Sequence, residues 1–161
     1  MILRKTIIII LIFGVSLLFS CKAAKEQTSV NNSPKLEAII STDKQKYQLG
    51  ENISLYFEVK NNTKQTHSFC FWHTPFDNFT SDFLKINSNG KRINYIGKIV
   101  KRMPPTKADY IKLKPGESSK KVKIIINEGY QIVEKGTYKI SFQGGYASTI
   151  ENSNEIQFTI E

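Results

Sequence analysis

The stretch ISLYFEV, residues 53–59, decides the fold class of this chain. Its apolar residues, Ile53, Leu55, Phe57 and Val59, alternate strictly with more polar neighbours. Successive side chains of a β-strand point to opposite faces, so this period of two predicts a strand with one buried face.

Short strand-like stretches separated by turns continue on both sides of residues 53–59. None of them carries a sustained helical period. The Asn89-Gly90 pair is a strong hairpin signal, because both positions tolerate a positive φ, and we expect its return strand at Ile93–Ile96. The other expected strands cover residues 36–40, 68–72, 83–86, 95–100, 110–113, 122–126, 136–142 and 156–160. About seven to nine short strands in one domain predict an all-β, antiparallel β-sandwich.

A short motif near the C-terminus indicates which sandwich this is. In Glu134-Lys135-Gly136-Thr137-Tyr138, an acidic residue and a glycine precede a tyrosine that enters a late strand. This resembles the tyrosine corner of immunoglobulin-like domains. The alternative for Tyr138 is an ordinary half-buried strand residue. We therefore predict an immunoglobulin-like antiparallel β-sandwich.

The N-terminus has the pattern of an export signal. A basic start, Arg4 and Lys5, precedes a short apolar run, and Leu18-Phe19-Ser20-Cys21 resembles the lipobox of bacterial lipoproteins. In such proteins the cysteine is acylated and becomes the new N-terminus, which predicts lipidation of Cys21 and anchoring to a membrane. The alternative is an uncleaved anchor helix.

The expected domain organisation follows from that signal. Residues 1–20 form the lipoprotein signal peptide, residues 21–34 a polar tether, and residues 35–161 one β-sandwich domain. Lys22 follows the cysteine where some lipoproteins have Asp, which resembles lipoproteins passed on to the outer membrane where there is one. The expected location is the cell envelope.

The chain is basic, with 23 Lys and Arg against 14 Asp and Glu and a net charge of +9. In a cytosolic protein this excess would point to nucleic acid, but the export signal argues against such a partner. The charge instead concerns anionic lipid headgroups, an acidic partner protein, or solubility only.

The sequence carries no pattern that predicts catalysis. No nucleophile, zinc, phosphate-loop or dinucleotide motif is present, and the carboxylates are scattered among lysines. Cys70 lies in an aromatic run and is expected to behave as a buried hydrophobic residue. Pairing it with His73 on a metal is the alternative, but only one other histidine, His67, exists to complete a site. We expect no enzyme activity, metal or cofactor.

A basic stretch broken by prolines, residues 95–118, is the candidate binding segment. Two strand-like pieces, residues 95–100 and 110–113, flank a connection that Pro104 and Pro105 keep extended, and the turn at 114–117 closes it. An extended segment of this kind must lie at a sheet edge or over a surface. The candidate partner-binding residues are Lys101, Arg102, Pro104, Pro105, Asp109 and Tyr110.

The same stretch resembles a known family. Tyr95-Ile-Gly-Lys, Lys101-Arg102, Pro105-Thr106, Asp109-Tyr110 and Gly116-Glu117-Ser118, with Trp72-His73-Thr74-Pro75 upstream, are similar to the N-terminal non-catalytic domain of bacterial deuterolysin-like metallopeptidases, which include peptidyl-Lys metalloendopeptidases. The resemblance covers residues 36 to 143. In that family this domain is a prosegment that precedes the enzyme. The resemblance implies contact with a peptidase and, because the zinc-binding catalytic domain is missing from this sequence, no hydrolysis.

Two functions are therefore expected as alternatives. In one, the domain binds or inhibits a peptidase through residues 101–110. In the other, it is a structural or interaction module of the cell envelope that binds another protein or a glycan, the latter on an aromatic platform of Trp72, Phe76 and Phe79. For residues 101–110 a purely structural role also remains open, in which Asp109 pairs with Lys101 or Arg102 and Tyr110 packs inward.

Overall fold

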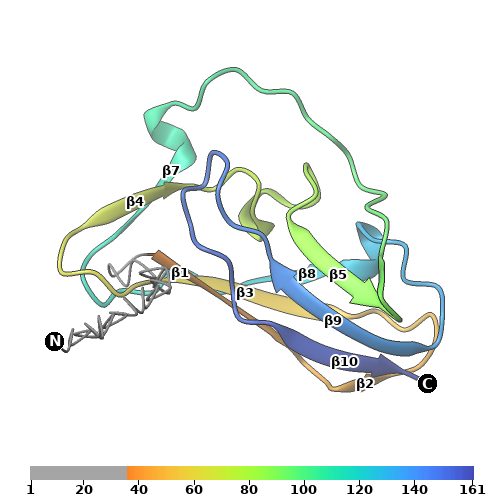
Figure 1. Ribbon diagram of the computed structural model, residues 1–161. Helices are drawn as coiled ribbons and strands as arrows, with labels where there is room; N and C mark the ends of the chain where they lie inside the picture. Colours follow the sequence, from red (N-terminus) through yellow and green to blue (C-terminus); the bar gives the residue numbers. More distant parts are fainter. Residues whose placement is uncertain (1–35) are drawn as a thin grey trace, which may run out of the picture. The chain divides into compact units, whose positions relative to one another are not determined.

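The computed structural model describes residues 36–161 of the chain. The expected signal peptide and tether, with Cys21, lie outside the described residues. Within the described part, β-strands and short 3-10 helices make up the regular structure (Figure 1). No helix in this part has the length and apolar character needed to cross a membrane.

The strands are β1 (Leu36–Thr42), β2 (Lys46–Tyr47), β3 (Ser54–Asn61), β4 (His67–Cys70), β5 (Leu84–Ser88), β6 (Lys91–Arg92), β7 (Tyr110–Leu113), β8 (Val122–Ile125), β9 (Gly136–Phe142) and β10 (Ile156–Ile160). The 3-10 helices are η1 (Pro75–Asp77), η2 (Lys107–Asp109) and η3 (Ile126–Glu128). The described strands form sheets in the orders β1-β3-β8, β2-β10-β9-β5-β6 and β4-β7.

The predicted fold class is confirmed: the described residues form ten strands, two of them very short, against an expected seven to nine. The additional short strands, β2 and β6, are only two residues long, too short for an alternating pattern to show. Strand pairs are antiparallel except for β2, which runs parallel to β10 with Thr159 opposite Lys46.

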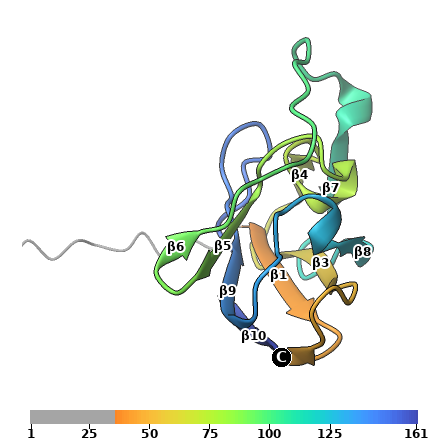
Figure 2. The same ribbon diagram turned by 90° about the vertical axis from the view of Figure 1, so that its right-hand side faces the viewer.

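The two larger sheets face each other across one core (Figure 2). Residues 53–59 behave as predicted, since Ile53, Leu55, Phe57 and Val59 are all buried. The ring of Phe57 in β3 reaches Phe142 in β9, at 4.9 Å between ring centroids. This contact joins the two sheets at the centre of the core.

The Asn89-Gly90 turn forms as predicted, but its return strand does not. Asn89 and Gly90 have φ of 51° and 74°, as a two-residue hairpin turn requires. The pairing that follows is β6, with Arg92 opposite Asn87, and the last bond runs from the Ile93 N–H to the Ile86 carbonyl. The prediction of Ile93–Ile96 as the return strand is therefore wrong, because a two-residue turn places the first paired residues directly after Gly90.

Tyr138 makes the predicted tyrosine corner. Its hydroxyl donates a 2.7 Å hydrogen bond to the carbonyl of Glu134, and its ring is buried and stacked on Phe158. In antibody domains a disulfide cysteine stands two residues after this tyrosine. Here that position is Ile140, which is buried, so apolar packing occupies the centre of the sandwich in place of a disulfide.

Asn61, the last residue of β3, is a buried polar residue that holds two loops together. Its side-chain amide donates to the carbonyls of Gln65, Leu113 and Lys114 at 2.8, 3.0 and 3.1 Å. Its backbone N–H donates to the Glu117 carbonyl at 2.9 Å. Asn61 therefore joins the β3–β4 loop to the turn that follows β7.

Candidate functional site

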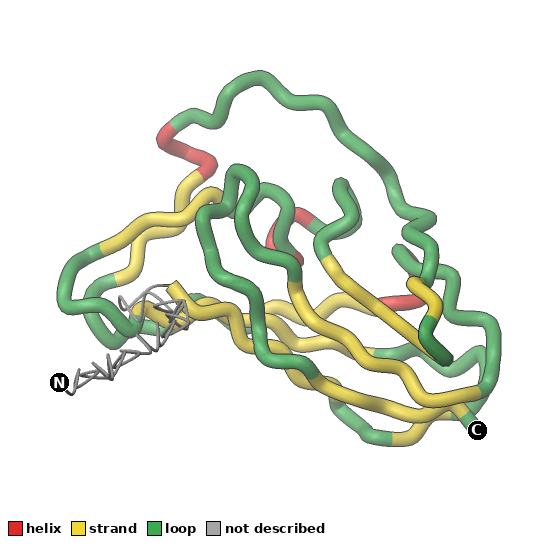
Figure 3. Tube along the Cα trace, viewed as in Figure 1, coloured by secondary structure: helices red, strands yellow, loops and turns green. Residues whose placement is uncertain are grey.

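The candidate binding segment is a long connection, here called the strap and defined as residues 96–110. It leaves the sandwich after the bridge between Tyr95 and Tyr130, arches away from the sheets, and returns through η2 into β7 (Figure 2; long loop at the top of Figure 3). The strap is therefore fixed at both ends while its middle projects from the domain.

The first half of the strap is not a strand, and backbone hydrogen bonds to a neighbouring loop hold it in place. The N–H groups of Lys98 and Val100 donate to the carbonyls of Phe79 and Thr80, at 3.1 and 3.0 Å. The prediction of a strand over Tyr95–Val100 is wrong beyond the Tyr95 bridge, because the neighbouring segment at residues 79–80 is itself a loop. The second predicted piece, Tyr110–Leu113, is confirmed as β7.

Arg102 fastens the middle of the strap to the domain. Its guanidinium donates to both carboxylate oxygens of Asp77, at 2.8 and 2.7 Å, and lies 4.9 Å from the centroid of the Trp72 ring. Both bonds come from one guanidinium nitrogen, and the planar guanidinium over the Trp72 ring adds a cation–π contact for which arginine is well suited. The predicted alternative of an Asp109 pair with Lys101 or Arg102 is thus wrong, because Arg102 pairs with Asp77.

Asp109 instead closes the second half of the strap. One carboxylate oxygen accepts from the backbone N–H and the hydroxyl of Thr106, both at 2.8 Å, and the other accepts from the indole N–H of Trp72 at 3.1 Å. These hydrogen bonds, those from Thr106 foremost, lower the pKa of Asp109. Trp72 thus contacts the strap twice, through Arg102 on its ring and Asp109 on its nitrogen.

The outer surface of the strap is exposed and combines cations with apolar side chains. Lys101, Pro104 and Pro105 are exposed, and Tyr110 is 43% exposed, so its predicted inward packing is wrong. Ile99 and Met103 are 84% and 82% exposed, and the sequence reasoning missed both. Their signal was present in the sequence, since apolar residues in a proline-broken basic segment have no core to enter.

The aromatic platform considered for glycan binding does not form. Trp72 is only 8% exposed, and Phe76 and Phe79 pack against the core. Phe76 lies between Phe57 and Phe69, with ring centroids 5.7 and 5.8 Å away. Trp72 contacts the strap, Phe76 and Phe79 pack on the core, and none of the three rings offers an open surface for stacking on a sugar.

Cys70 is buried, as predicted, and desolvation raises the pKa of its thiol. Among residues 36–161, no three His, Cys, Asp or Glu side chains lie close enough together to hold a metal ion. The thiol therefore serves the packing of β4 in this part of the chain.

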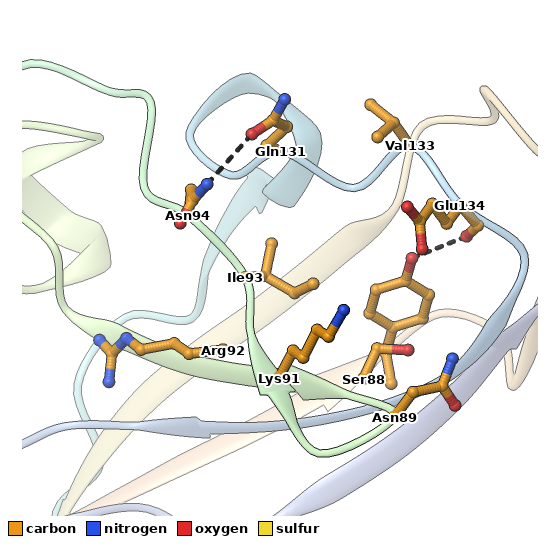
Figure 4. A pocket seen from close by; sticks show the side chains of 10 residues that line it. Ser88, Asn89, Lys91, Arg92, Ile93, Asn94, Gln131, Val133 and Glu134 are labelled. Atoms are coloured by element: carbon orange, nitrogen blue, oxygen red, sulfur yellow. Dashed lines mark hydrogen bonds between the residues drawn. The ribbon is translucent and has the colours of Figure 1, made fainter.

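A cleft of about 290 Å³, with no strap residue in its lining, lies between residues 88–94 and residues 131–138 (Figure 4). One end is closed by a 3.4 Å hydrogen bond from the Asn94 amide to Gln131, and the other by the tyrosine corner. The cleft is lined mainly by polar groups, and Tyr138, the single aromatic residue in its lining, is buried. The strap has the more exposed and more distinctive surface.

Acidification should loosen the strap at Asp109. Because the folded-state pKa of Asp109 lies below the ordinary 3.8, its carboxylate stabilises the fold above that pH, and this stabilisation is lost as the pH falls through the lower folded pKa. Trp72 is the single tryptophan of the chain, so its fluorescence reports the change. We expect its emission to move to longer wavelength below about pH 4. An Asp109→Asn variant should lack this step; an identical step in the variant would contradict the assignment.

The described residues form a β-sandwich with a buried apolar core and one projecting loop, the strap. An immunoglobulin-like domain model matches residues 44–158, and the chain belongs to the family of immunoglobulin-like domains. Such domains generally act as non-catalytic interaction modules.

Comparison with curated proteins gave no match. Among solved structures, a β-glucosidase, EmGH1 from Erythrobacter marinus, is similar with 14% sequence identity and a TM-score of 0.42. The alignment covers 78% of this chain and 16% of the glucosidase, so the chain spans less than a fifth of that protein's length.

Proposed function

We propose that this protein is a lipid-anchored, non-catalytic interaction module of the cell envelope, and that its strap binds a partner protein. Acylation of Cys21 would supply the anchor, and an outer membrane, where there is one, would carry it. The observation that carries the proposal is the strap itself. Ile99, Lys101 and Met103 are exposed on it, and the hydrogen bonds of Arg102 and Asp109 fix its backbone to the domain.

The physical argument for binding is preorganisation. A loop that is already held in one conformation loses less entropy on binding than a flexible one, so more of its contact energy appears as affinity. Pro104 and Pro105 restrict the backbone, and the Asp77–Arg102 pair restrains the middle of the strap. Exposed Met and Tyr are side chains enriched at protein interfaces.

We further propose that the partner is a peptidase, which the domain restrains. The support is the resemblance of residues 36 to 143 to the prosegment-type domain of deuterolysin-like metallopeptidases, in which the strap contains the matching central block. The peptidase that we propose as the partner is a separate protein of the same cell envelope.

Capture from envelope extracts tests the proposal. The full chain carries a C-terminal tag, and the metallopeptidase activity that it retains is assayed before and after release. The strap variant Lys101→Ala/Met103→Ala/Tyr110→Ala removes outer contacts and leaves Trp72, Arg102 and Asp109 intact. We expect it to recover at least about tenfold less peptidase than the parent, which corresponds to about 1.4 kcal/mol.

A matched control removes the same kinds of side chain elsewhere. Lys85→Ala/Leu49→Ala/Tyr146→Ala also takes away one exposed lysine, one large aliphatic residue and one exposed tyrosine. It should capture as the parent does. Equal capture by the strap variant would place the contact outside the strap, and failure of the parent to capture and inhibit any peptidase would refute the peptidase proposal.

A further inference from the structure

A second exposed surface lies at the end of the domain where the chain enters β1. Five lysines gather there and are here called the lysine end: Lys60, Lys64, Lys112, Lys114 and Lys120. All five are exposed, and none forms an ion pair with another described residue. The strap and its partner have no part in this surface.

Backbone pairing brings these lysines together from separate parts of the chain. Lys60 bridges to Ser118, Ser68 is paired with Lys112, and the buried Asn61 binds the carbonyl of Lys114. Figure 1 shows the loop after β3 and the turn after β7 side by side at one end of the domain. Because Asn61 joins both loops, the positive charges are held on a fixed frame.

The carboxylates at this end offset only part of the positive charge. Glu117 accepts from the backbone N–H of Lys114, and Glu37 accepts from the Asn62 side chain. A third carboxylate, Glu58, is paired with Lys121, which is not counted in the lysine end. Glu151, whose backbone N–H donates to the Leu36 carbonyl, also lies at this end. The five lysines therefore outnumber the three carboxylates Glu37, Glu117 and Glu151.

The first residue of the domain lies among these lysines. Leu36 is opposite Asn61 in the β1–β3 pair, and Glu37 is opposite Lys60. In the sequence, Cys21 is about fifteen residues before Leu36, so even a fully extended chain holds the two within about 50 Å. If Cys21 is acylated as proposed above, the lysine end is the part of the domain tied most directly to the membrane.

We propose that the lysine end contacts the anionic lipid headgroups of the membrane that carries the anchor. Basic clusters beside a lipid anchor are attracted to anionic leaflets, and the attraction acts over about 10 Å at moderate salt. This contact orients the domain, and it adds a second membrane signal to the acyl chains. The proposal rests on the proposed anchor and is independent of the strap's partner.

Lysine footprinting on liposomes tests the contact. The full chain, purified from membranes of the producing cell, is reconstituted into liposomes of phosphatidylcholine alone or with about one-third phosphatidylglycerol. Amine acetylation is then followed residue by residue by mass spectrometry. We expect the lysine end to be protected at least about threefold in the anionic liposomes only, and the protection to disappear at about 1 M salt. The strap lysines Lys98, Lys101 and Lys107 serve as internal controls and should react equally in both.

Two charge-matched variants locate the effect. Lys60→Gln/Lys64→Gln/Lys114→Gln should abolish the protection of Lys112 and Lys120, whereas Lys98→Gln/Lys101→Gln/Lys107→Gln should leave it unchanged. Protection of the strap lysines instead, or equal reactivity in both liposomes, would overturn the proposal. A chain that does not float with either liposome lacks the anchor and would overturn it as well, while peptidase capture by the strap would be unaffected by any of these results.

Discussion

Asn61→Ala should lower the free energy of unfolding by about 3 kcal/mol, measured by urea denaturation of the full chain. The substitution removes one amide that donates to three carbonyls and accepts from the Thr63 N–H. Asn61 is 0% exposed, so water cannot replace these bonds without opening the loops. A buried polar group that loses its partner keeps the full cost of its desolvation.

The adjacent asparagine provides the control for this prediction. Asn62 is exposed and its side chain donates only to Glu37, so Asn62→Ala should change stability by less than about 0.5 kcal/mol. Asn61→Asp should be at least as damaging as Asn61→Ala, because a carboxylate would face the carbonyls of Leu113 and Lys114. A stability of Asn61→Ala within about 1 kcal/mol of the parent would show that the two loops are held by their backbone bonds instead.

The inward direction of Asn61 could be predicted from the alternating pattern of β3. Asn61, Asn62 and Thr63 have the composition of a turn. However, the period of two that buries Phe57 and Val59 continues through β3 and places Asn61 in the same inward phase. The phase of the strand predicts that Asn61 points inward; the three carbonyls that it meets come from residues up to 53 positions away and leave no local signal.

The strands themselves were largely predictable because their signals are local. The bounds of β9 and β10 agree with the expected stretches at residues 136–142 and 156–160. The tyrosine corner was also accessible, since its hydrogen bond joins Tyr138 to a residue only four positions earlier. Period-two alternation, glycine turns and short-range motifs depend only on residues that are a few positions apart in the sequence.

The pairings of the strap could not be predicted in the same way. Asp109 is the nearest acidic residue to Arg102 in the sequence and was considered as a partner of Lys101 or Arg102, but Arg102 binds Asp77, 25 positions away. That choice depends on where η1 lies, and η1 is placed by the packing of Phe76 on the core. Charge pairing across such distances follows from tertiary packing, which composition and spacing do not contain.

Phe57→Ala should lower the free energy of unfolding by about 4 kcal/mol, the largest effect we expect from one substitution in this chain. Phe57 is 0% exposed and touches Phe142 of the opposite sheet and Phe76 of η1. The alanine variant therefore loses apolar burial and leaves a cavity at the point where the sheets and η1 meet. Phe57→Leu keeps most of the volume and should cost only about 1.5 kcal/mol.

The same substitution tests whether the core positions the strap. Asp77 follows Phe76 directly, so a shift of η1 into the cavity would move the carboxylate that binds Arg102 and draw the guanidinium from the Trp72 ring. In the folded state of Phe57→Ala, the Trp72 emission should therefore shift toward longer wavelength, as it should in Arg102→Ala, whereas Phe57→Leu should keep the parent spectrum. If Phe57→Ala is destabilised but its folded spectrum equals that of the parent, the strap is held by its own contacts with Trp72 and Asp77, and the core determines stability without determining the shape of the binding surface.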